Sequence, residues 1–595
     1  MPQRKWTQRI RTLWLGLAVC LLVAHSVAQA GGESPEDGQA PQGIRDSSTD
    51  QVNAESAKSV EGPRDFLHAS KEDVDHWREL KFGLFIHWGP ISLIGEPIGW
   101  SRGGERRGWR GSGHIPVEIY DNLYKRFDPV FFDADEWVQM AKDAGMKYMV
   151  FTSKHHDGFS MFDSQLTEYK ITNTLFKRDV LKELADACHK GGLKLGVYYS
   201  LPDWYHPDYR TENHERFLEF MHGQVREICT NYGTIDIMWW DGLGGTAEDW
   251  GSVELFKMIR ELQPNVIINN RGGLGGDHGS VEQRAGLGQF GRPWEANMTL
   301  CTRWAWIPHD EMKPLKKCIQ TLVKVVGGDG NFLFDVGPMS DGRIEKRQIA
   351  RLREMGDWLE SYGESVYDTR GGPFEPGNWG SSTRKGNTIY LHVLNWPEEA
   401  IALPLIPNKI VASSVMTGGT VRLEQTADAI EVSVAKADRR ELDTIVVLEL
   451  DSPASEISVR PLLSSPLTVG KEMKASNTYD NPKPPHNDPK LAVDDDPETR
   501  WAAESGVTQA WLQVDMEEPT TFNRTKIREE YDRIHGFELQ YKDGGQWKTF
   551  AQGTTIGSDY STQFEPVTAR YIRLNILEAT DGPTIGEFQL FAPRK

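Results

Sequence analysis

Side chains of catalytic types follow short apolar segments at several points in this chain. Apolar segments of this length are typical of buried strands, and the polar residues after them would lie at the carboxyl edge of a parallel sheet. That edge carries the active sites of (β/α)8 barrels. A helix-like segment and a glycine precede several of these strands, which is the order found in parallel barrels. The polar residues concerned are His87, His155, His156, Ser200, Asp241 and Asn269, Asn270 and Arg271.

The chain has 595 residues and is too long for a single hydrophobic core. The barrel pattern covers residues 63–368 and predicts an α/β catalytic domain of the (β/α)8 type. Helical periodicity then disappears, and short alternating runs predict a β-sandwich over 369–452. The same kind of pattern predicts a second all-β sandwich over 455–595.

The first 62 residues have the composition of a leader and a linker. Residues 1–30 combine an N-terminal basic region, an apolar segment and Ala28-Gln29-Ala30, which is the pattern of a cleaved secretory signal peptide. Its apolar segment is too short to span a bilayer. Residues 31–62 are rich in Gly, Ser, Pro, Gln and Asp and predict a disordered linker. We therefore expect a secreted or periplasmic protein that is not held in a membrane after cleavage.

Net charge and cysteine spacing exclude two classes of function. The formal net charge is −19 at pH 7, which disfavours binding to nucleic acid or to an anionic membrane. No cysteine belongs to a CxxC pair, so zinc-finger chemistry is excluded and buried free thiols are expected. The cysteines beyond the predicted leader are Cys188, Cys229, Cys301 and Cys318.

Hydrolysis of a glycosidic bond through an oxocarbenium-like transition state requires two carboxyl groups around the anomeric carbon. Asp241 is the candidate nucleophile because it directly follows the apolar run 235–240. Glu282 and Glu295 are both candidates for the proton donor. Glu295 follows Trp294, and burial against an indole would raise the pKa of a carboxyl group, as a donor requires. The residues themselves leave the choice open.

The histidines would donate hydrogen bonds to sugar hydroxyl groups, and neighbouring tryptophans would offer apolar faces to the sugar ring. The candidate aromatic residues are Trp88, Trp240, Trp304 and Trp306. A divalent metal held by the same histidines and aspartates is an alternative. Barrel amidohydrolases hold such a metal with two histidines separated by one residue on the first strand, where this chain has only His87. We therefore expect no catalytic metal and no cofactor required for catalysis.

At these residues the chain resembles glycoside hydrolase family 29, the α-L-fucosidases. The likeness covers about 67–450. It implies a retaining mechanism with a covalent fucosyl-aspartate, in which Asp241 is the nucleophile. It also implies that His87, His155, His156, Tyr199 and Arg271 bind the fucose. The matching stretches are 82–89 (FGLFIHWG), 131–134 (FFDA), 154–159 (KHHDGF), 240–242 (WDG) and 331–338 (NFLFDVGP).

The resemblance also bears on the proton donor and shows one departure. The spacing after Arg271 aligns Glu282 with the acid/base of many members, whereas other members use a glutamate that resembles Glu295; we predict Glu282. Many relatives have Glu-Trp in the loop after the first strand, where this chain reads Gly99-Trp100. Trp100 remains an expected sugar contact, but the carboxylate that usually contacts the sugar hydroxyls is missing. Either Glu96 or Glu105 takes its place, or the pocket accepts a variant sugar.

Residues 455–594 resemble a discoidin-type (factor 5/8 type C) module, similar to carbohydrate-binding module family 32. The residues that carry this likeness are mostly scaffold residues and say little about a ligand. Asp494, Asp495 and Asp496 are candidates for a structural calcium, with a solvated acidic turn as the alternative. The matching stretches include 493–501 (VDDDPETRW), 511–515 (WLQVD), 569–574 (ARYIRL) and 585–588 (IGEF).

Together these observations predict a secreted, retaining exo-α-L-fucosidase that removes terminal fucose from oligosaccharides or polysaccharides. A glycosidase for a related sugar, such as an α-L-galactoside or a sulfated fucoside, is one alternative. A non-catalytic carbohydrate-binding protein on the same fold is another, and a metal-dependent hydrolase is a third.

Overall fold

The computed structural model describes residues 66–593, apart from 286–287, 397–398, 463–464, 481–486, 497–498 and 559. The predicted signal peptide (1–30) and linker (31–62) lie outside the described residues.

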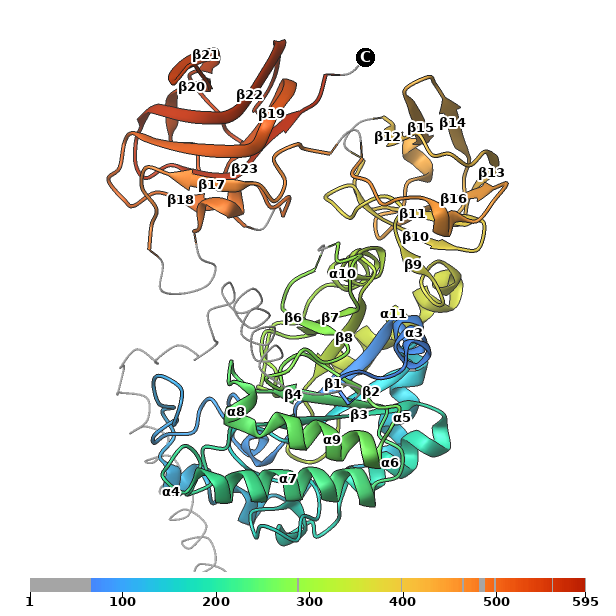
Figure 1. The fold of residues 1–595 in the computed structure, drawn as a ribbon, viewed down its shortest axis with the longest axis vertical. Helices are drawn as coiled ribbons and strands as arrows, with labels where there is room; N and C mark the ends of the chain where they lie inside the picture. The colour runs from blue at the N-terminus through green and yellow to red at the C-terminus, as the bar shows by residue number, and fades with distance from the viewer. Residues whose placement is uncertain are drawn as a thin grey trace, which may run out of the picture. The chain divides into compact units, whose positions relative to one another are not determined.

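The first part of the described chain is built on an eight-stranded sheet in which every pair of neighbours is parallel (Figure 1). The strand order is β5-β4-β3-β2-β1-β8-β7-β6. A bridge between Asn269 and His278 joins the two edge strands, and Asn270 N donates to His278 O at 2.9 Å. The sheet therefore closes on itself, which confirms the predicted barrel. The strands are β1 (Phe82–Ile86), β2 (Tyr148–Lys154), β3 (Lys194–Ser200), β4 (Ile237–Asp241), β5 (Ile267–Ile268), β6 (Gly279–Glu282), β7 (Trp294–Thr299) and β8 (Asn331–Val336).

Helices follow most of these strands and begin and end where the sequence provides caps. Asp133 and Asp179 each accept a backbone N–H three residues later, and Gly192 ends α6 in the left-handed conformation. In the described part of the chain no helix follows β5 or β6, where loops take its place. The helices are α3 (Lys71–Leu80), α4 (Val117–Tyr120), α5 (Ala134–Asp143), α6 (Val180–Gly191), α7 (His214–Asn231), α8 (Ala247–Trp250), α9 (Ser252–Leu262), α10 (Leu315–Gly327) and α11 (Lys346–Tyr362).

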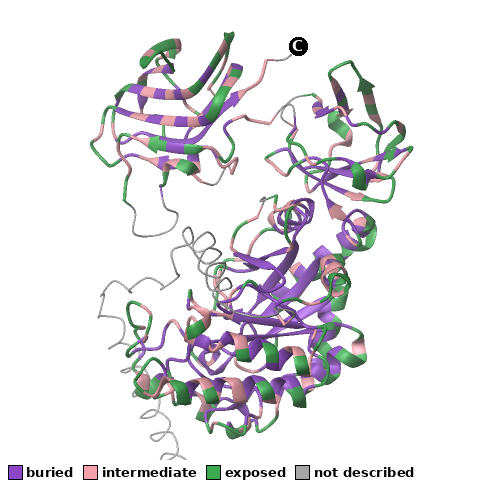
Figure 2. Cartoon of the chain, in the orientation of Figure 1, coloured by how far each residue is buried: buried purple, intermediate pink, exposed green. Residues whose placement is uncertain are grey.

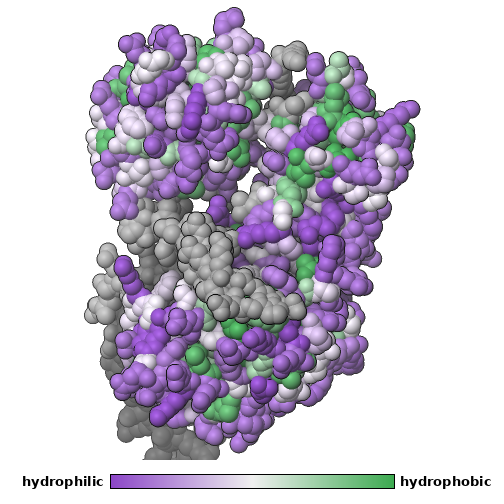
Figure 3. All heavy atoms as spheres, in the orientation of Figure 1, coloured by the Kyte–Doolittle hydropathy of each residue, from purple (hydrophilic) through white to green (hydrophobic). Residues whose placement is uncertain are grey.

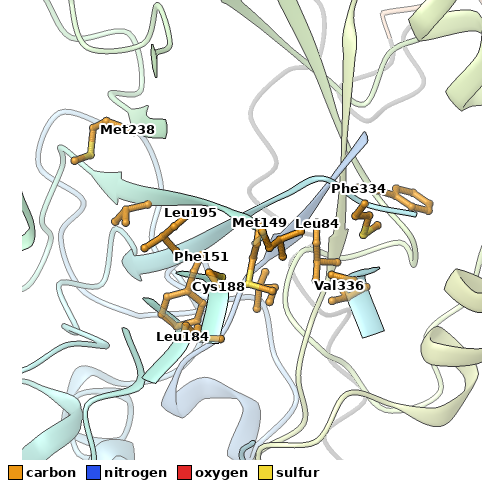
Figure 4. Close-up of a cluster of buried hydrophobic side chains, with 14 of the residues drawn as sticks. Leu84, Met149, Phe151, Leu184, Cys188, Leu195, Met238, Phe334 and Val336 are labelled. Carbon is orange, nitrogen blue, oxygen red and sulfur yellow. The ribbon is translucent and has the colours of Figure 1, made fainter. Parts of the chain in front are cut away.

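The two faces of the barrel sheet carry different apolar clusters. The outer face packs against the helices, and the helices expose only the side turned away from the sheet (Figure 2). Figure 4 shows part of this outer cluster, where Phe151 of β2 lies beside Leu184 and Cys188 of α6. The inner face is lined by aromatic residues. One of them, Tyr148, lies so close to β1 that a Cβ on Gly83 would be 2.4 Å from its ring.

The rest of the described chain is all-β, as predicted. The first group of strands forms a five-stranded sheet (β13-β16-β11-β10-β9) and a three-stranded sheet (β12-β15-β14) around a shared apolar core. Its strands are β9 (Arg370–Gly371), β10 (Gly380–Lys385), β11 (Thr388–Val393), β12 (Ile401–Pro404), β13 (Ile410–Val415), β14 (Val421–Gln425), β15 (Ala429–Val434) and β16 (Thr444–Leu450).

The last strands form a separate seven-stranded antiparallel sheet with its own core. The face of the molecule in Figure 3 is mainly hydrophilic, because the large apolar side chains lie in these cores. The strands are β17 (Glu472–Ala475), β18 (Trp501–Ala502), β19 (Ala510–Glu529), β20 (Ile534–Asp543), β21 (Gln546–Gly553), β22 (Tyr560–Ala579) and β23 (Thr584–Phe591).

Two further expectations concern single residues and membrane segments. Cys188, Cys229, Cys301 and Cys318 are all buried free thiols, as expected. Within the described ranges, no helix has both the length and the apolar character needed to cross a bilayer.

Candidate active site

Asp241 ends β4 at the carboxyl edge of the barrel. The Tyr198 hydroxyl donates to Asp241 Oδ2 at 3.0 Å, and His156 Nε2 lies 3.4 Å from the same oxygen. On the other side, Arg271 Nη1 lies 3.8 Å from Oδ1. The Asp241 side chain is 15% exposed. The carboxylate is therefore held from two sides and still reaches solvent, which suits a positioned nucleophile.

Arg271 brings Glu282 next to this carboxylate. The same Nη1 donates to Glu282 Oε2 at 3.4 Å, and the guanidinium carbon lies 5.0 Å from the centre of the Trp239 ring. Arg271 follows β5 and Glu282 ends β6, so both lie at the carboxyl edge. The Glu282 side chain is 31% exposed. The structure thus places two carboxyl groups around one guanidinium at the barrel mouth.

Glu295 occupies a lower level of the barrel. On β7 it pairs with Ser280, two residues before Glu282 on the neighbouring strand. It is 0% exposed; the Tyr148 hydroxyl donates to Oε1 at 2.7 Å and Trp239 Nε1 to Oε2 at 2.9 Å. Burial raises the pKa of Glu295 to about 7. The pKa is raised as a proton donor requires, yet the group lies in the barrel floor with both oxygens occupied by protein donors.

His87 is paired with a carboxylate that the sequence did not single out. His87 Nδ1 lies 2.7 Å from Asp335 Oδ1, and both side chains are buried. Burial raises the pKa of Asp335 to about 6, and the neighbouring His87 acts in the opposite direction. Because a carboxylate accepts, Nδ1 of His87 carries the proton and Nε2 remains for a substrate hydroxyl. The His87 ring also lies 5.0 Å from that of Trp304.

The paired histidines have different surroundings. His156 Nδ1 lies 2.6 Å from Ser200 Oγ, whose own proton goes to a backbone carbonyl. Nδ1 of His156 must therefore donate to Ser200, which leaves Nε2 facing Asp241. The His155 ring stacks on Tyr198 with an angle of 5° between the planes. Burial and the neighbouring histidines hold the pKa of His155 well below its usual value, so its imidazole is neutral.

The structure contradicts the sugar-binding roles predicted for Tyr199 and Trp240. Tyr199 donates its hydroxyl to a glutamine of α7, and the Trp240 ring packs on a phenylalanine of α9. Successive side chains of a strand point to opposite faces, so these two belong to the outer packing layer. Their neighbours Tyr198 and Trp239, which pair in register between β3 and β4, are the residues inside the barrel.

Trp88 also lies away from Asp241. Its ring packs against Phe127, Phe132 and Trp137, and its Nε1 donates to the Met339 carbonyl. Trp88 is part of the outer apolar cluster, so the structure contradicts the sugar contact expected of it. The preceding residue, His87, is the candidate for that contact.

Trp100 lies where a sugar contact is expected, and Gly99 is explained by crowding. The Trp100 ring centre is 5.4 Å from that of His156. Gly99 has a φ of +66°, and a Cβ there would be 2.5 Å from His155 Nδ1. No side chain fits at position 99 with this backbone. Of the two nearby glutamates, Glu96 lies 3.6 Å from His114, and Glu105 is exposed.

In the part of the chain that the structure covers, no three His, Cys, Asp or Glu side chains are grouped as metal ligands. The histidines of the barrel mouth are instead engaged by Asp335, Ser200 and Asp241. This donor set suits hydrogen bonding to hydroxyl groups. With two carboxyl groups at the rim, the arrangement can perform acid-assisted nucleophilic substitution at a sugar carbon.

Comparisons with known proteins agree with this chemistry. A family model described as Alpha-L-fucosidase matches residues 49–364, and one described as F5/8 type C domain matches residues 472–588. The chain is 30% identical to plasma alpha-L-fucosidase of Homo sapiens over 354 residues, which are 54% of this chain and 75% of that protein.

The solved structures that are similar to this chain include two bacterial fucosidases. Alpha-L-fucosidase isoenzyme 1 from Paenibacillus thiaminolyticus has a TM-score of 0.58 and 37% identity, covering 64% of this chain and 99% of that one. A GH29 alpha-L-fucosidase from Bacteroides thetaiotaomicron, trapped as a covalent intermediate with 2-fluoro-fucosyl fluoride, has a TM-score of 0.57 and 28% identity, covering 66% and 98%.

Proposed function

Since this chain belongs to the alpha-L-fucosidase family of glycoside hydrolases, we propose that it is a retaining exo-α-L-fucosidase acting on fucosylated glycans. The proposal rests on one observation: the same guanidinium nitrogen, Nη1 of Arg271, lies between the carboxyl groups of Asp241 and Glu282. Retention needs a nucleophile and an acid/base close together around one anomeric carbon. The trapped covalent intermediate of the Bacteroides relative supports the same route.

In the first step, Asp241 attacks the anomeric carbon of the fucosyl group while Glu282 protonates the leaving oxygen. The bond to the leaving glycan breaks and an ester bond to Asp241 forms, so the proton of Glu282 leaves with the aglycone alcohol. Tyr198 donates to Asp241 and Arg271 lies beside it, and both keep the carboxylate aimed at the carbon. His87 and His155 supply ring nitrogens to the fucose hydroxyls.

In the second step, Glu282 is a carboxylate and acts as base. It takes a proton from a water molecule, whose oxygen attacks the same carbon and releases Asp241. Fucose leaves with the configuration of the substrate, and Glu282 is again protonated for the next cycle. Arg271 touches both carboxyl groups and therefore stabilises the negative charge that moves between them.

Two further expectations belong to the proposal. Residues 1–30 would direct the chain to secretion or to the periplasm. Sequencing the N-terminus of the exported protein would test this.

A structural calcium in the last domain is supported by Glu587, whose two carboxyl oxygens are buried with no protein partner. Burial and the neighbouring Asp495 and Asp494 raise the pKa of Glu587 to about 9. Asp494 and Asp495 already accept protein hydrogen bonds, so other oxygens would have to complete the site. A melting temperature insensitive to both calcium and chelator would refute this ion.

The function is tested by mixing the purified protein with an aryl α-L-fucoside and recording NMR spectra of the released fucose during the first minutes of the reaction. We expect the α anomer of fucose to appear first and mutarotate later. Direct release of the β anomer would refute retention. Hydrolysis of an aryl α-L-galactoside in preference to the fucoside would refute the proposal that fucosides are the substrate. Binding of fucose without any turnover would favour the non-catalytic alternative.

A further inference from the structure

The loop between β1 and α4 carries aromatic and basic side chains that lie beside the candidate active site. Its backbone passes so close to His155 that only glycine fits at position 99. The next residue, Trp100, contacts the His156 ring, and Trp109 further along the loop lies 5.8 Å from Trp100, ring to ring. The loop therefore connects the residues around Asp241 to the exposed rim of the barrel.

A second segment completes this wall. Trp204, from the loop after β3, lies 5.0 Å from His156, and its backbone N–H donates to the His156 carbonyl at 2.8 Å. Its ring is also 5.2 Å from that of Trp100, at an angle of 73°. Trp100 and Trp204 thus form a continuous aromatic surface beside His156.

Arg106 lies on this aromatic surface without a counter-charge. Its guanidinium carbon is 5.2 Å from both the Trp100 and the Trp204 ring centres, and Nη2 donates to the Trp100 carbonyl. The residue is 5% exposed, and its Nε is buried without a hydrogen-bond partner. A buried cation that has neither a carboxylate nor a full set of acceptors is costly, and an anionic ligand would satisfy it.

The surrounding loop adds positive charge in a chain whose net charge is −19. Arg107 donates to three backbone carbonyls of the β3 loop, and Arg110 is exposed. Within the described ranges, neither these two nor Arg106 forms an ion pair with a carboxylate, whereas Arg102 is paired with Asp121. Between Arg102 and Arg110 the acidic residue is Glu105, and it is exposed.

We propose that this loop forms the leaving-group subsite and that Arg106 and Arg110 bind an anionic group on the glycan to which fucose is attached. The sugar rings of the leaving group would lie on the Trp100 and Trp109 side, with the anion at the guanidinium groups. A sulfate ester and a sugar carboxylate share the required chemistry. The inference rests on the proposed fucosidase function and specifies its substrate class.

The test compares kcat/KM for one neutral fucosylated oligosaccharide with kcat/KM for the same oligosaccharide carrying either a sulfate ester or a carboxylate on its leaving-group sugars. We expect the anionic forms to be favoured about ten-fold or more at low salt, since a hydrogen bond to a charged group typically has that effect. The preference should fall as ionic strength rises. The sulfate and carboxylate arms identify which oxyanion the subsite takes.

Variants assign the preference to the loop. Arg106→Gln and Arg110→Gln should each move the ratio of anionic to neutral kcat/KM toward one. Arg353→Gln, which removes one exposed positive charge from α11, should keep the wild-type ratio. If Arg106→Gln does not fold, Arg110→Gln decides the matter. A wild-type ratio near one, or a ratio that both variants leave unchanged, would overturn the subsite. Failure to hydrolyse any of the substrates, the aryl α-L-fucoside included, would instead overturn the proposed function.

Discussion

Glu282 and Glu295 lie on neighbouring strands, but one side chain is partly exposed and the other is fully buried. Glu282 is at the end of β6, partly exposed and next to a guanidinium, whereas Glu295 is two residues deeper on β7, sealed in and bound by Tyr148 and Trp239. A raised pKa alone would select Glu295, and position selects Glu282. The difference teaches that depth along a barrel strand separates a group at the rim, here the proposed acid/base Glu282, from one that supports the barrel floor.

A second contrast runs across the sheet rather than along it. Tyr198 and Tyr199 are adjacent and both buried, but Tyr198 contacts Asp241 inside the barrel and Tyr199 contacts α7 outside it. Burial of both residues is complete, so exposure does not distinguish them. Only the two-residue alternation of the strand assigns one to chemistry and the other to packing.

The tyrosine contrast predicts the larger effect on activity. Tyr198→Phe removes a hydrogen bond to Asp241, the proposed nucleophile, and should lower kcat/KM about 10- to 100-fold. Tyr199→Phe removes a hydrogen bond in the outer layer, so it should cost about 1 kcal/mol of unfolding free energy with kcat/KM near the wild-type value. Steady-state kinetics and thermal melts of both variants check this. Equal kinetic losses in the two variants would contradict the division between the faces.

Glu295 predicts a smaller effect that appears in stability. Its pKa is raised from 4.5 to about 7, so the folded state favours the protonated form. The stability associated with that proton is present below about pH 4.5 and is lost as pH rises through about 7. Glu295→Gln stays neutral, with its oxygen able to accept from Trp239 and its amide able to donate to Tyr148. The melting temperature of the variant should therefore rise relative to wild type between pH 5 and pH 8.

The expected change corresponds to roughly 3 kcal/mol of unfolding free energy. It is measured by melting both proteins across this pH range in buffers of equal ionic strength. A difference in melting temperature that is independent of pH would contradict the buried-acid interpretation of Glu295.

Much of the fold was predictable because barrel strands and helices leave strong local patterns. The strand-end positions of Asp241, His87, His155 and His156 were visible for the same reason. Alternation counted back from Asp241 places Trp239, and not Trp240, on the same face of the strand, so the sequence alone favours Trp239.

Other parts of the site depend on register and on sheet closure. The choice of Tyr198 requires the pairing of β3 with β4, and the choice between Glu282 and Glu295 requires that of β6 with β7. The contact of His87 with Asp335 joins strands β1 and β8, which are neighbours only in the folded barrel. Such long-range pairings have no signal in a single sequence.

The most direct test of the account is chemical rescue of Glu282→Ala and Glu295→Ala with azide on an activated aryl α-L-fucoside. Loss of the acid/base should lower turnover about 10²- to 10⁴-fold. A small anion needs no base to attack the glycosyl-aspartate, so azide should restore turnover of Glu282→Ala and give α-L-fucosyl azide. It should have no such effect on Glu295→Ala. Rescue of Glu295→Ala with Glu282→Ala unaffected would contradict the assignment.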